Sequence, residues 1–533
     1  MKKLIKPVIL ILSAAIFLVG CRAAPDYSSS DVVPGQVSSV RKTKNSLTLL
    51  YSASDSFNPY TAKSEINRQL LKLVFDPLVK LDNEYNVKYC VAESVTLNGT
   101  ECTAKISDRK FSDGSAVTAD DVVSSFALAK ASASEYGYKL YGAVSARAQD
   151  ARTVVFKLAK ADPYFANVLD FPIIKKGTEN RVDSDSVALP PIGCGRYVPS
   201  DGATVLVLNT ASYGNAFNIK EIKLLNAPDP ESVSHYAEIG AADMYYSDIS
   251  DGNIVRMSGK KVNININRIV FLAVNANRGV LADANIRQAL STAIDRTAVC
   301  RDSFYNNALA ATGFYNPVWA PIKSVQNIEK TANKEITVEI LEKLGYNSVD
   351  GDGVRKNGGT KLRFELLVNS ENRMRAAAAQ IIAANLAECG ISVKVTEKNF
   401  ADYTAALSSG NFELCLAETE ITPNMDLTNL VTEGGSTAYG VKYPKPEENA
   451  AQEEGGNTGV ALNAKTPADL ISGFYGGENT VADVASVLQT EMPFIPVCYR
   501  TGVLFSNDNI ENVNGSSASD IYFSIDSYTC YTK

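Results

Sequence analysis

Histidine is nearly absent from this chain of 533 residues, which contains only His235. Histidine is the usual acid or base near neutral pH and a frequent metal ligand, so its scarcity argues against histidine-based catalysis and multi-histidine metal sites. No two cysteines have the C-x-x-C spacing of zinc and redox motifs. We therefore expect no cofactor and no metal, and the chain is not predicted to be an enzyme.

Other catalytic signatures are missing too. The sequence contains no G-x-S-x-G elbow, no H-E-x-x-H pair and no P-loop. The carboxylate pair Asp120-Asp121 is explained by helix capping, and Glu453-Glu454 lies in a polar segment predicted to form a surface loop at 442–458. The run Asp350-Gly-Asp-Gly353 fits a hairpin turn better than a calcium loop, because Val354 stands where an oxygen ligand is required.

Positive charge is not in excess. The 59 acidic and 52 basic residues give a net charge of −7 and are spread along the chain, which argues against nucleic acid as a partner. With 45% hydrophobic residues and this length, the sequence is typical of a globular protein with more than one core.

The first 21 residues have the pattern of an export signal. Lys2, Lys3 and Lys6 precede an apolar stretch at 8–19 that is too short to span a bilayer. The sequence LVGC ending at Cys21 resembles the lipobox of bacterial lipoproteins, in which the cysteine is lipidated; a chance cysteine after a plain signal peptide is the alternative. We expect a lipid-anchored protein on the outer face of the cell membrane or in the periplasm.

Residues 22–45 show no periodic pattern and are predicted to form a flexible tether, with the folded part starting near Leu47. Eight cysteines follow Cys21. A bridge between Cys90 and Cys102 across a turn at Asn98-Gly99 and unpaired thiols are equally compatible with the sequence.

Strand and helix patterns alternate along the chain, which predicts a mixed α/β fold. Strands are expected at 47–51, at 154–158, as a pair within 87–106, and after Gly390. Helices are expected at 64–75, from a cap at Thr118 to about 131, at 284–299 behind a cap at Asp283, and at 373–389.

Short motifs in order along the chain resemble the large solute-binding proteins of bacterial ABC importers, family 5, which includes oligopeptide-, dipeptide- and nickel-binding proteins. They are 57–59 (FNP), 91–94 (VAES), 111–114 (FSDG), 118–122 (TADDV), 193–197 (GCGRY), 239–244 (IGAADM), Asn275, 283–290 (DANIRQAL), 293–296 (AIDR), 390–391 (GI), 412–414 (FEL) and 493–496 (PFIP). No single motif is decisive, but their ordered occurrence from about 47 to 510 is specific.

The resemblance implies a two-lobed periplasmic-binding-protein-like fold of type II, in its large three-domain variety, with a hinge and a cleft between lobes. It assigns 46–78, 190–269 and 498–533 to a base lobe, 79–189 to an inserted second domain and 270–497 to a distal lobe. Closure around a ligand is the motion expected of such a hinge.

By the same resemblance, two segments offer main-chain groups to an extended ligand: 61–67, which holds Thr61, Lys63, Ser64 and Glu65, and 416–422. Peptide-binding members carry a tryptophan and an aspartate in the second segment, where this chain has Thr419 and Thr422. Recognition of a peptide amine would then require another carboxylate. The candidates are Glu418, Glu420 and Asp426, with solvated surface carboxylates as the alternative.

Aromatic side chains supply a second set of candidate ligand contacts, with packing in a core as the alternative. They are Tyr60, Tyr245, Tyr246, Trp319 and Tyr499.

The resulting hypothesis is a monomeric receptor that captures short peptides and delivers them to an ABC permease. The alternatives are a receptor for an oligosaccharide or a chelated metal, and a secreted hydrolase or adhesion protein on the same scaffold.

Overall fold

The computed structural model describes residues 41–249, 252, 255, 257–325, 328–443 and 465–532. The predicted signal peptide, Cys21 and the tether up to residue 40 lie outside the described residues, as do Glu453-Glu454 and nearly all of the predicted loop at 442–458. In the described part, no helix has the length and apolar character needed to cross a bilayer.

Two sheets bring the first and last described strands together. A four-stranded sheet has the order β2 (Ser46–Tyr51), β11 (Glu221–Asn226), β10 (Val205–Leu208) and β9 (Tyr197–Pro199), with β2 and β11 parallel. The other sheet has the order β1 (Thr43–Lys44), β23 (Thr529–Tyr531) and β22 (Ile510–Glu511). Strand β1 lies inside the predicted tether, so the first strand begins before Leu47. The helical segments of this region are α1 (Glu65–Leu71), η2 (Asp201–Ala203), α4 (Thr210–Tyr213) and α5 (Pro230–Glu238).

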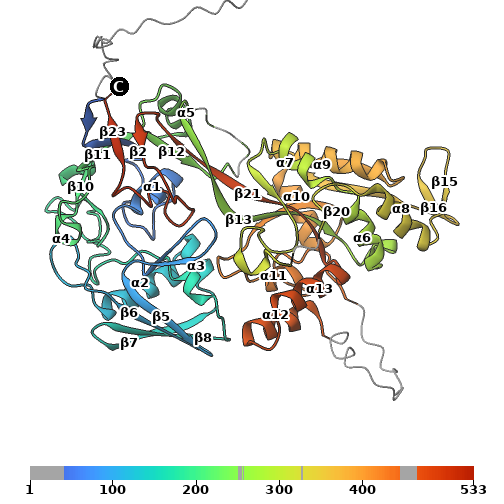
Figure 1. Ribbon diagram of the computed structural model, residues 1–533, viewed down its shortest axis with the longest axis horizontal. Helices are drawn as coiled ribbons and strands as arrows, with labels where there is room; N and C mark the ends of the chain where they lie inside the picture. The colour runs from blue at the N-terminus through green and yellow to red at the C-terminus, as the bar shows by residue number, and fades with distance from the viewer. Residues whose placement is uncertain are drawn as a thin grey trace, which may run out of the picture. The chain divides into compact units, whose positions relative to one another are not determined.

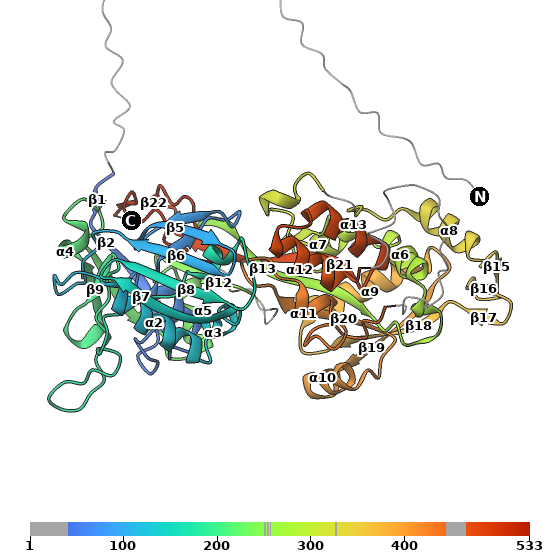
Figure 2. The same ribbon diagram turned by 90° about the horizontal axis from the view of Figure 1, so that it is seen from below.

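A second antiparallel sheet occupies residues 92–158 and is visible in Figure 2. Its order is β5 (Ala92–Asn98), β6 (Glu101–Ile106), β8 (Thr153–Leu158) and β7 (Ala143–Asp150), and a hairpin of β3 (Val79–Leu81) and β4 (Val87–Tyr89) precedes it. The other elements here are α2 (Ala119–Ala131), α3 (Glu135–Lys139) and η1 (Phe165–Val168). The predicted cap is confirmed, because Thr118 and Asp121 form a capping box at the start of α2.

The largest sheet in the described chain has seven strands and runs between two hydrophobic cores. Its order is β12 (Met244–Ser247), β21 (Phe494–Ser506), β13 (Lys260–Val274), β20 (Leu414–Glu420), β18 (Arg363–Asn369) and β19 (Ser392–Lys398), with β14 (Ala308–Ala310) on β21. Helices α9 (Arg373–Ala387) and α10 (Phe400–Ser409) pack on β18 and β19. The remaining elements are η3 (Gly279–Ala282), α6 (Ala284–Thr292), α7 (Arg296–Asp302), η4 (Ala320–Ile322), α8 (Lys334–Lys343), β15 (Ser348–Val349), β16 (Arg355–Asn357), β17 (Thr360–Lys361), α11 (Thr428–Val431), α12 (Pro467–Gly476) and α13 (Val481–Glu491).

Strands β13 and β21 connect the two cores (Figure 1). Ile264 and Leu504 belong to the core that contains β2, α1 and α2, whereas Ile269–Val274 and Phe494–Tyr499 belong to the core around β18 and α9. The pairing of β13 with β21 is irregular between Asn265 and Ile269, where the chain passes from one core to the other. The fold is therefore the predicted two-lobed α/β architecture, with its crossing strands interrupted at one point. The predicted division into base lobe and inserted domain stays a prediction.

Some predicted elements differ from the observed ones. The helix expected at 284–299 is two helices, α6 and α7, because the Asp295 carboxylate accepts a hydrogen bond from the backbone N–H of Ala298 and starts a new helix. The helix expected at 64–75 ends at Leu71, and the segment 87–106 holds three strands, not two. The Asp350–Gly353 hairpin turn is confirmed, since it joins β15 to β16.

The possible Cys90–Cys102 bridge is wrong. The register of β5 and β6 places Leu97, not Cys90, opposite Cys102, and Cys90 precedes the paired part of β5. Both thiols are free, and Cys102 is fully buried against the sheet core.

Candidate functional site

A cavity of about 230 Å³ lies where β13 passes between the two cores. Its wall combines α1, the β3–β4 turn, the irregular stretch of β13, the end of β20 and a loop near residue 518. The lining residues are Glu65, Arg68, Gln69, Lys72, Leu81, Asp82, Tyr85, Glu135, Lys139, Asp170, Tyr246, Asp248, Asn265, Ile266, Asn267, Arg268, Glu420, Ile421, Pro423, Ala518 and Ser519. Small-molecule sites prefer such positions between lobes, so this cavity is the candidate ligand site.

The irregular stretch of β13 is held from both sides. The Asn265 amide donates to the Asn83 carbonyl at 2.7 Å, and the backbone N–H of Asn265 donates to the Asn83 side chain at 2.8 Å. Asn267 donates to the carbonyl of Thr422 at 3.2 Å and accepts from Asn316 at 3.3 Å. These bonds satisfy main-chain and amide groups where the strand pairing fails, and they fix the shape of the cavity floor.

Three of the predicted site residues, Glu65, Tyr246 and Glu420, line this cavity. Glu65 is the first residue of α1, whose N-cap is Ser64. Tyr246 lies on β12 and packs over Gly502, where an added Cβ would come within 2.5 Å of the Tyr246 hydroxyl. Glycine at 502 therefore leaves the space that the tyrosine ring occupies beside the cavity.

The other predicted residues of the first segment are not in the wall. Asp55 organises the loop: its carboxylate accepts from the backbone N–H of Lys63 at 3.0 Å and from the hydroxyl and N–H of Ser64 at 2.6 and 2.8 Å. Thr61 is exposed and donates to the hydroxyl of Ser56. Tyr60 is buried and donates from its hydroxyl to the carbonyl of Pro172. This loop positions Glu65 and does not itself face the cavity.

Glu418, another predicted ligand carboxylate, forms ion pairs with three arginines of the same chain. Its side chain is only 6% exposed and lies 3.4 Å from Arg500, 3.7 Å from Arg375 and 3.7 Å from Arg268. Arg500 is fully buried and stacks on the Phe304 ring at 4.9 Å. Of these four residues only Arg268 lines the cavity, where it also pairs with Glu420 at 3.5 Å.

The remaining predicted residues lie in packed positions outside the cavity wall. The Asp426 carboxylate accepts from the Tyr141 hydroxyl. Trp319 is buried among Tyr164, Tyr315 and Phe474. Tyr499 is fully buried and donates to the Phe314 carbonyl at 2.7 Å. Tyr245 packs half-buried against two small clusters, and Thr419 is half-buried on β20.

The end of β20 contacts the region of residues 138–167 directly. The Tyr138 hydroxyl donates to the carbonyl of Glu420 at 3.3 Å, and Asn167 donates to the carbonyl of Pro423 at 3.1 Å. Asn424 donates to the Asp162 carboxylate at 2.7 Å. Burial raises the pKa of Asp162 to about 6, and the bond from Asn424 opposes that rise. These contacts hold the wall that carries Glu420.

Charges of both signs line the cavity, with six carboxylates and four basic groups. Burial, together with the charge of Asp248, raises the pKa of Glu65 to about 8, and burial also raises the pKa of Glu420 against the attraction of Lys139. Burial lowers the pKa of Lys72. Carboxylates that burial makes costly to ionise become easier to ionise when a ligand brings a positive group.

Several cavity residues were missed from the sequence. Lys72 donates to the carbonyl of Ala518, and Lys139 pairs with Asp170 at 3.1 Å and with Glu135 at 3.3 Å. The helical spacing of Glu65, Arg68, Gln69 and Lys72 on one face of α1 is a signal that would have found the first of these. No local pattern predicts that Ala518 and Ser519 approach them.

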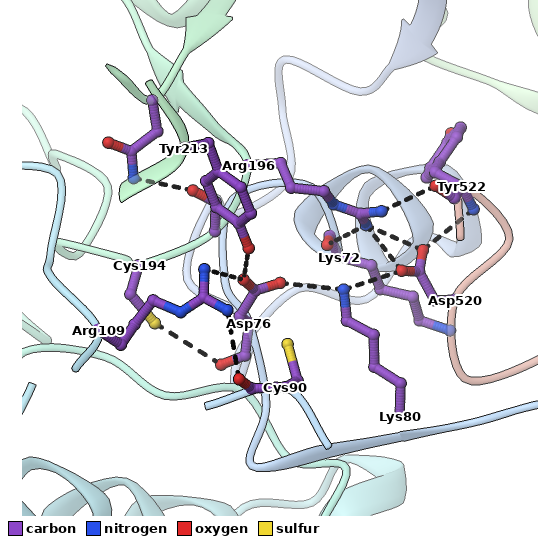
Figure 3. Close-up of polar contacts among 12 residues, drawn as sticks. Lys72, Asp76, Lys80, Cys90, Arg109, Cys194, Arg196, Tyr213, Asp520 and Tyr522 are labelled. Atoms are coloured by element: carbon purple, nitrogen blue, oxygen red, sulfur yellow. Dashed lines mark hydrogen bonds and ion pairs between the residues drawn. The ribbon is translucent and has the colours of Figure 1, made fainter. Parts of the chain in front are cut away.

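A buried charge network, drawn in Figure 3, includes Asp520, the residue after the cavity residue Ser519. The Lys80 ammonium lies between two carboxylates, 3.0 Å from Asp76 and 3.0 Å from Asp520. Arg196, from the GCGRY motif, is 2.8 Å from Asp520 and also donates to the carbonyl of Tyr522 at 2.7 Å. Arg109 completes the network 3.9 Å from Asp76. Burial would raise the pKa of Asp520, but Arg196 and Lys80 hold it at about 2.

The shared motifs mostly serve the fold. Asp243 accepts from Lys44 at 2.9 Å and from the backbone N–H of Thr48 at 2.8 Å, which joins β12 to the first strands. Buried Arg287 and Arg296 donate to main-chain carbonyls of the 491–496 segment. The motifs therefore identify the architecture and not the ligand.

Comparison with known proteins agrees with this architecture. Residues 86–439 match the bacterial extracellular solute-binding proteins, family 5 Middle, and the chain belongs to this family. The oligopeptide-binding protein AppA of Bacillus subtilis is 24% identical over 361 residues, covering 63% of this chain and 66% of that protein. The nickel-binding periplasmic protein of Escherichia coli is 22% identical over 240 residues, covering 43% and 46%. The matched part is thus under two thirds of each of these relatives.

The structure of Bacillus subtilis AppA in complex with a nonapeptide superposes with a TM-score of 0.57 and 19% identity, covering 92% of this chain and all of that one. At this identity the likeness shows the fold. The family is one of solute-binding receptors found outside the cytoplasm, and these two relatives are named for binding oligopeptides and nickel.

Proposed function

We propose that this protein is the lipid-anchored substrate-binding receptor of an ABC importer, that it captures short peptides, and that it delivers them to the permease as a monomer without altering them. The observation that carries the proposal is the polar cavity at the irregular crossing of β13. Cys21 would bear the lipid, and 46–78, 190–269 and 498–533 would form the base lobe facing the distal lobe at 270–497.

Closure supplies the mechanism. A ligand in the cavity would touch Glu65 and Tyr246 on one side and Glu420 on the other, and these groups come from both sides of the crossing. Only contacts made in the closed state and absent from the open state shift the population toward closure. The asparagines that hold Asn265 and Asn267 would then be the pivots about which the lobes move.

Charge at the cavity favours a ligand that carries a positive group. Glu418 is engaged by three arginines and Asp426 by Tyr141, which leaves Glu420 and Glu65 as the predicted carboxylates that face the cavity. A desolvated ammonium needs such a partner. Arg68 and Lys72 on the same wall would suit a carboxylate, so a zwitterionic peptide matches both signs.

Thermal denaturation against peptides tests this proposal, because a ligand that binds only the folded form raises the apparent Tm. Among unmodified peptides of different lengths, we expect some to raise the Tm. The rise should be smaller when the same peptides are N-acetylated. Glu420→Gln should reduce the rise, whereas Glu339→Gln on α8, outside the cavity, should not. No shift across varied lengths and charges would refute a peptide ligand.

A second candidate is a chelated metal or an oligosaccharide held in the same cavity. It is favoured by Thr419 and Thr422, which stand where peptide-binding members carry tryptophan and aspartate, and by the nickel-binding relative. Native mass spectrometry of the purified protein separates the candidates, since a retained peptide, sugar or metal chelate each adds its own mass.

A further inference from the structure

Several charged side chains of the cavity are already neutralised by other side chains of the protein. Lys139 pairs with Asp170 at 3.1 Å and with Glu135 at 3.3 Å. Arg268 pairs with Glu420 at 3.5 Å. Recognition of charge on a ligand therefore falls first to the cavity side chains that lack such a partner.

Helix α1 and its C-cap supply two charged side chains of that kind. Glu65 and Lys72 both line the cavity, and within the residues that the structure describes neither forms an ion pair. The Lys72 ammonium donates to the carbonyl of Ala518. Burial lowers the pKa of Lys72, and burial together with Asp248 raises the pKa of Glu65 to about 8. A ligand that supplies the missing counter-charges would offset this cost of burial.

These two side chains are separated by a fixed distance along the helix. Glu65 is the first residue of α1, and Lys72 is its C-cap with helical backbone angles. At about 1.5 Å of rise per residue, they lie about 10 Å apart along the axis. An extended peptide covers at most about 3.3–3.6 Å per residue, so its two ends match this separation when it has about two or three residues.

The volume of the cavity agrees with a ligand of that size. It is about 230 Å³. Pockets for drug-sized ligands have volumes of roughly 300 Å³ or more. A longer extended peptide would have to leave one end outside the cavity, so only a short one can present both termini to α1.

Two neutral polar atoms near these charges lack partners in the same described residues. The Oε1 atom of Gln69 and the hydroxyl oxygen of Ser519 are buried without a hydrogen bond. Gln69 lies on α1 between Glu65 and Lys72, and Ser519 follows Ala518. Both side chains line the cavity and have rotatable bonds that let them turn toward a ligand. Since buried polar atoms are normally hydrogen bonded, a ligand N–H at Gln69 and a ligand carboxylate at Ser519 would complete them.

We propose that α1 selects free peptides of about two or three residues, with the ligand ammonium on Glu65 and the ligand carboxylate on Lys72 and Ser519. This inference rests on the proposed function and adds to it the length of the ligand, its direction and a residue for each end. The amino end of the ligand lies at the start of α1, and its carboxyl end lies near Ala518.

A length test uses pools of random-sequence peptides of roughly two to nine residues. The purified protein is incubated with each pool, and native mass spectrometry gives the mass of each retained peptide. We expect mainly dipeptides and tripeptides. Retention mainly of longer peptides overturns this inference and leaves the proposed function in place, whereas retention of no peptide from any pool overturns both.

Calorimetry with a retained peptide then assigns its two ends. On wild type, amidation of the carboxyl end and acetylation of the amino end should each weaken binding by about tenfold or more, because a charge pair is lost. Lys72→Met should abolish the amidation effect and keep the acetylation effect, and Glu65→Gln should do the reverse. Lys394→Met, at an exposed position of β19, is the matched control and should keep both effects.

The ratio of two affinities on one variant separates binding from folding. Partial unfolding lowers the amount of active protein equally for both forms of the peptide and leaves their ratio unchanged. Lys72→Gln, which keeps a donor for the Ala518 carbonyl, is a second variant and should behave like Lys72→Met. An undiminished amidation effect in both Lys72 variants, or an undiminished acetylation effect in Glu65→Gln, overturns the inference.

Discussion

The buried charges next to the cavity fall into two groups with different geometry. In the network of Asp76, Lys80, Arg196 and Asp520, the three closest ion pairs measure 2.8–3.0 Å. Around Glu418, one carboxylate faces three arginines at 3.4–3.7 Å. Both groups are largely shielded from water, so desolvation is comparable and the geometry distinguishes them.

The difference in ion-pair distances suggests that the two charge groups have different roles. The tight network joins segments of the chain more than 400 residues apart, and we refer to it as the clamp. The looser group adjoins the cavity through Arg268, which divides its contacts between Glu418 and Glu420. Arg268 lines the cavity, so an entering ligand can take the place of one of its two carboxylates, whereas Lys80, which two carboxylates also share, is not part of the cavity wall.

Breaking the tight network should have the largest effect. We expect Asp520→Asn to lower the free energy of unfolding by about 3–5 kcal/mol, because Arg196 and Lys80 remain buried without their carboxylate. Urea denaturation followed by the fluorescence of Trp319 measures it. The exposed Asp526→Asn in the same segment is the matched control, and equal losses in the two variants would contradict the clamp.

The low pKa of Asp520 predicts that the protein loses stability in acid. The pKa of Asp520 in the folded protein, about 2, lies below its ordinary value near 4, so its contribution is complete above pH 4 and is lost as the pH falls toward 2. The difference in stability between wild type and Asp520→Asn should therefore shrink over that range.

A smaller effect is expected at Glu418. Glu418→Gln keeps the size and one acceptor oxygen but removes the charge shared by three arginines at longer range. We expect a loss of about 1–3 kcal/mol in the same denaturation experiment. A loss equal to that of Asp520→Asn would show that the ion-pair distances do not separate the two groups.

At Glu65 the expected effect depends on pH and has the opposite sign. The pKa of Glu65 in the folded protein, about 8, lies above the ordinary value near 4.5. The protonated side chain therefore favours the folded protein below pH 4.5, and the protein loses stability as the pH rises from 4.5 toward 8. Glu65→Gln should make the protein more stable than wild type above pH 8 and equal to it near pH 4. A parallel pair of Tm–pH curves would rule this out.

The smallest effect is expected for an ion pair that is short but exposed to water. Lys343 and Glu339 on α8 lie 2.6 Å apart with side chains that are 72% and 62% exposed. Exposed pairs contribute little because solvent screens them. Glu339→Gln should leave the Tm unchanged within error, and a clear decrease would mean that distance alone determines the energy.

Local chemistry was predictable from the sequence, and long-range assembly was not. The Thr118–Asp121 capping box and the Asp350–Gly353 turn follow from residues within four positions of each other, and both are confirmed. The helix break at Asp295 was missed because the apolar spacing continues through it, although aspartate is also a good N-cap.

The candidate site shows the same limit. Family resemblance indicated Glu65, Tyr246 and Glu420, which line the cavity, but it could not indicate that arginines from three other elements surround Glu418. Ser519 lines the cavity together with Lys72, and the next residue, Asp520, belongs to the charge network. Such contacts depend on the whole fold and leave no periodic trace in the sequence.

The position of Asp520 affects how the protein is made. Strand β23 pairs with β1, and the carboxylate that neutralises Lys80 and Arg196 comes from the same late stretch of chain. During synthesis, Lys80 and Arg196 therefore lack this carboxylate, and β1 lacks its partner strand, until residues 510–531 have emerged. The last residues to be made thus complete both the sheet and the charge network of a region whose first strand is β1.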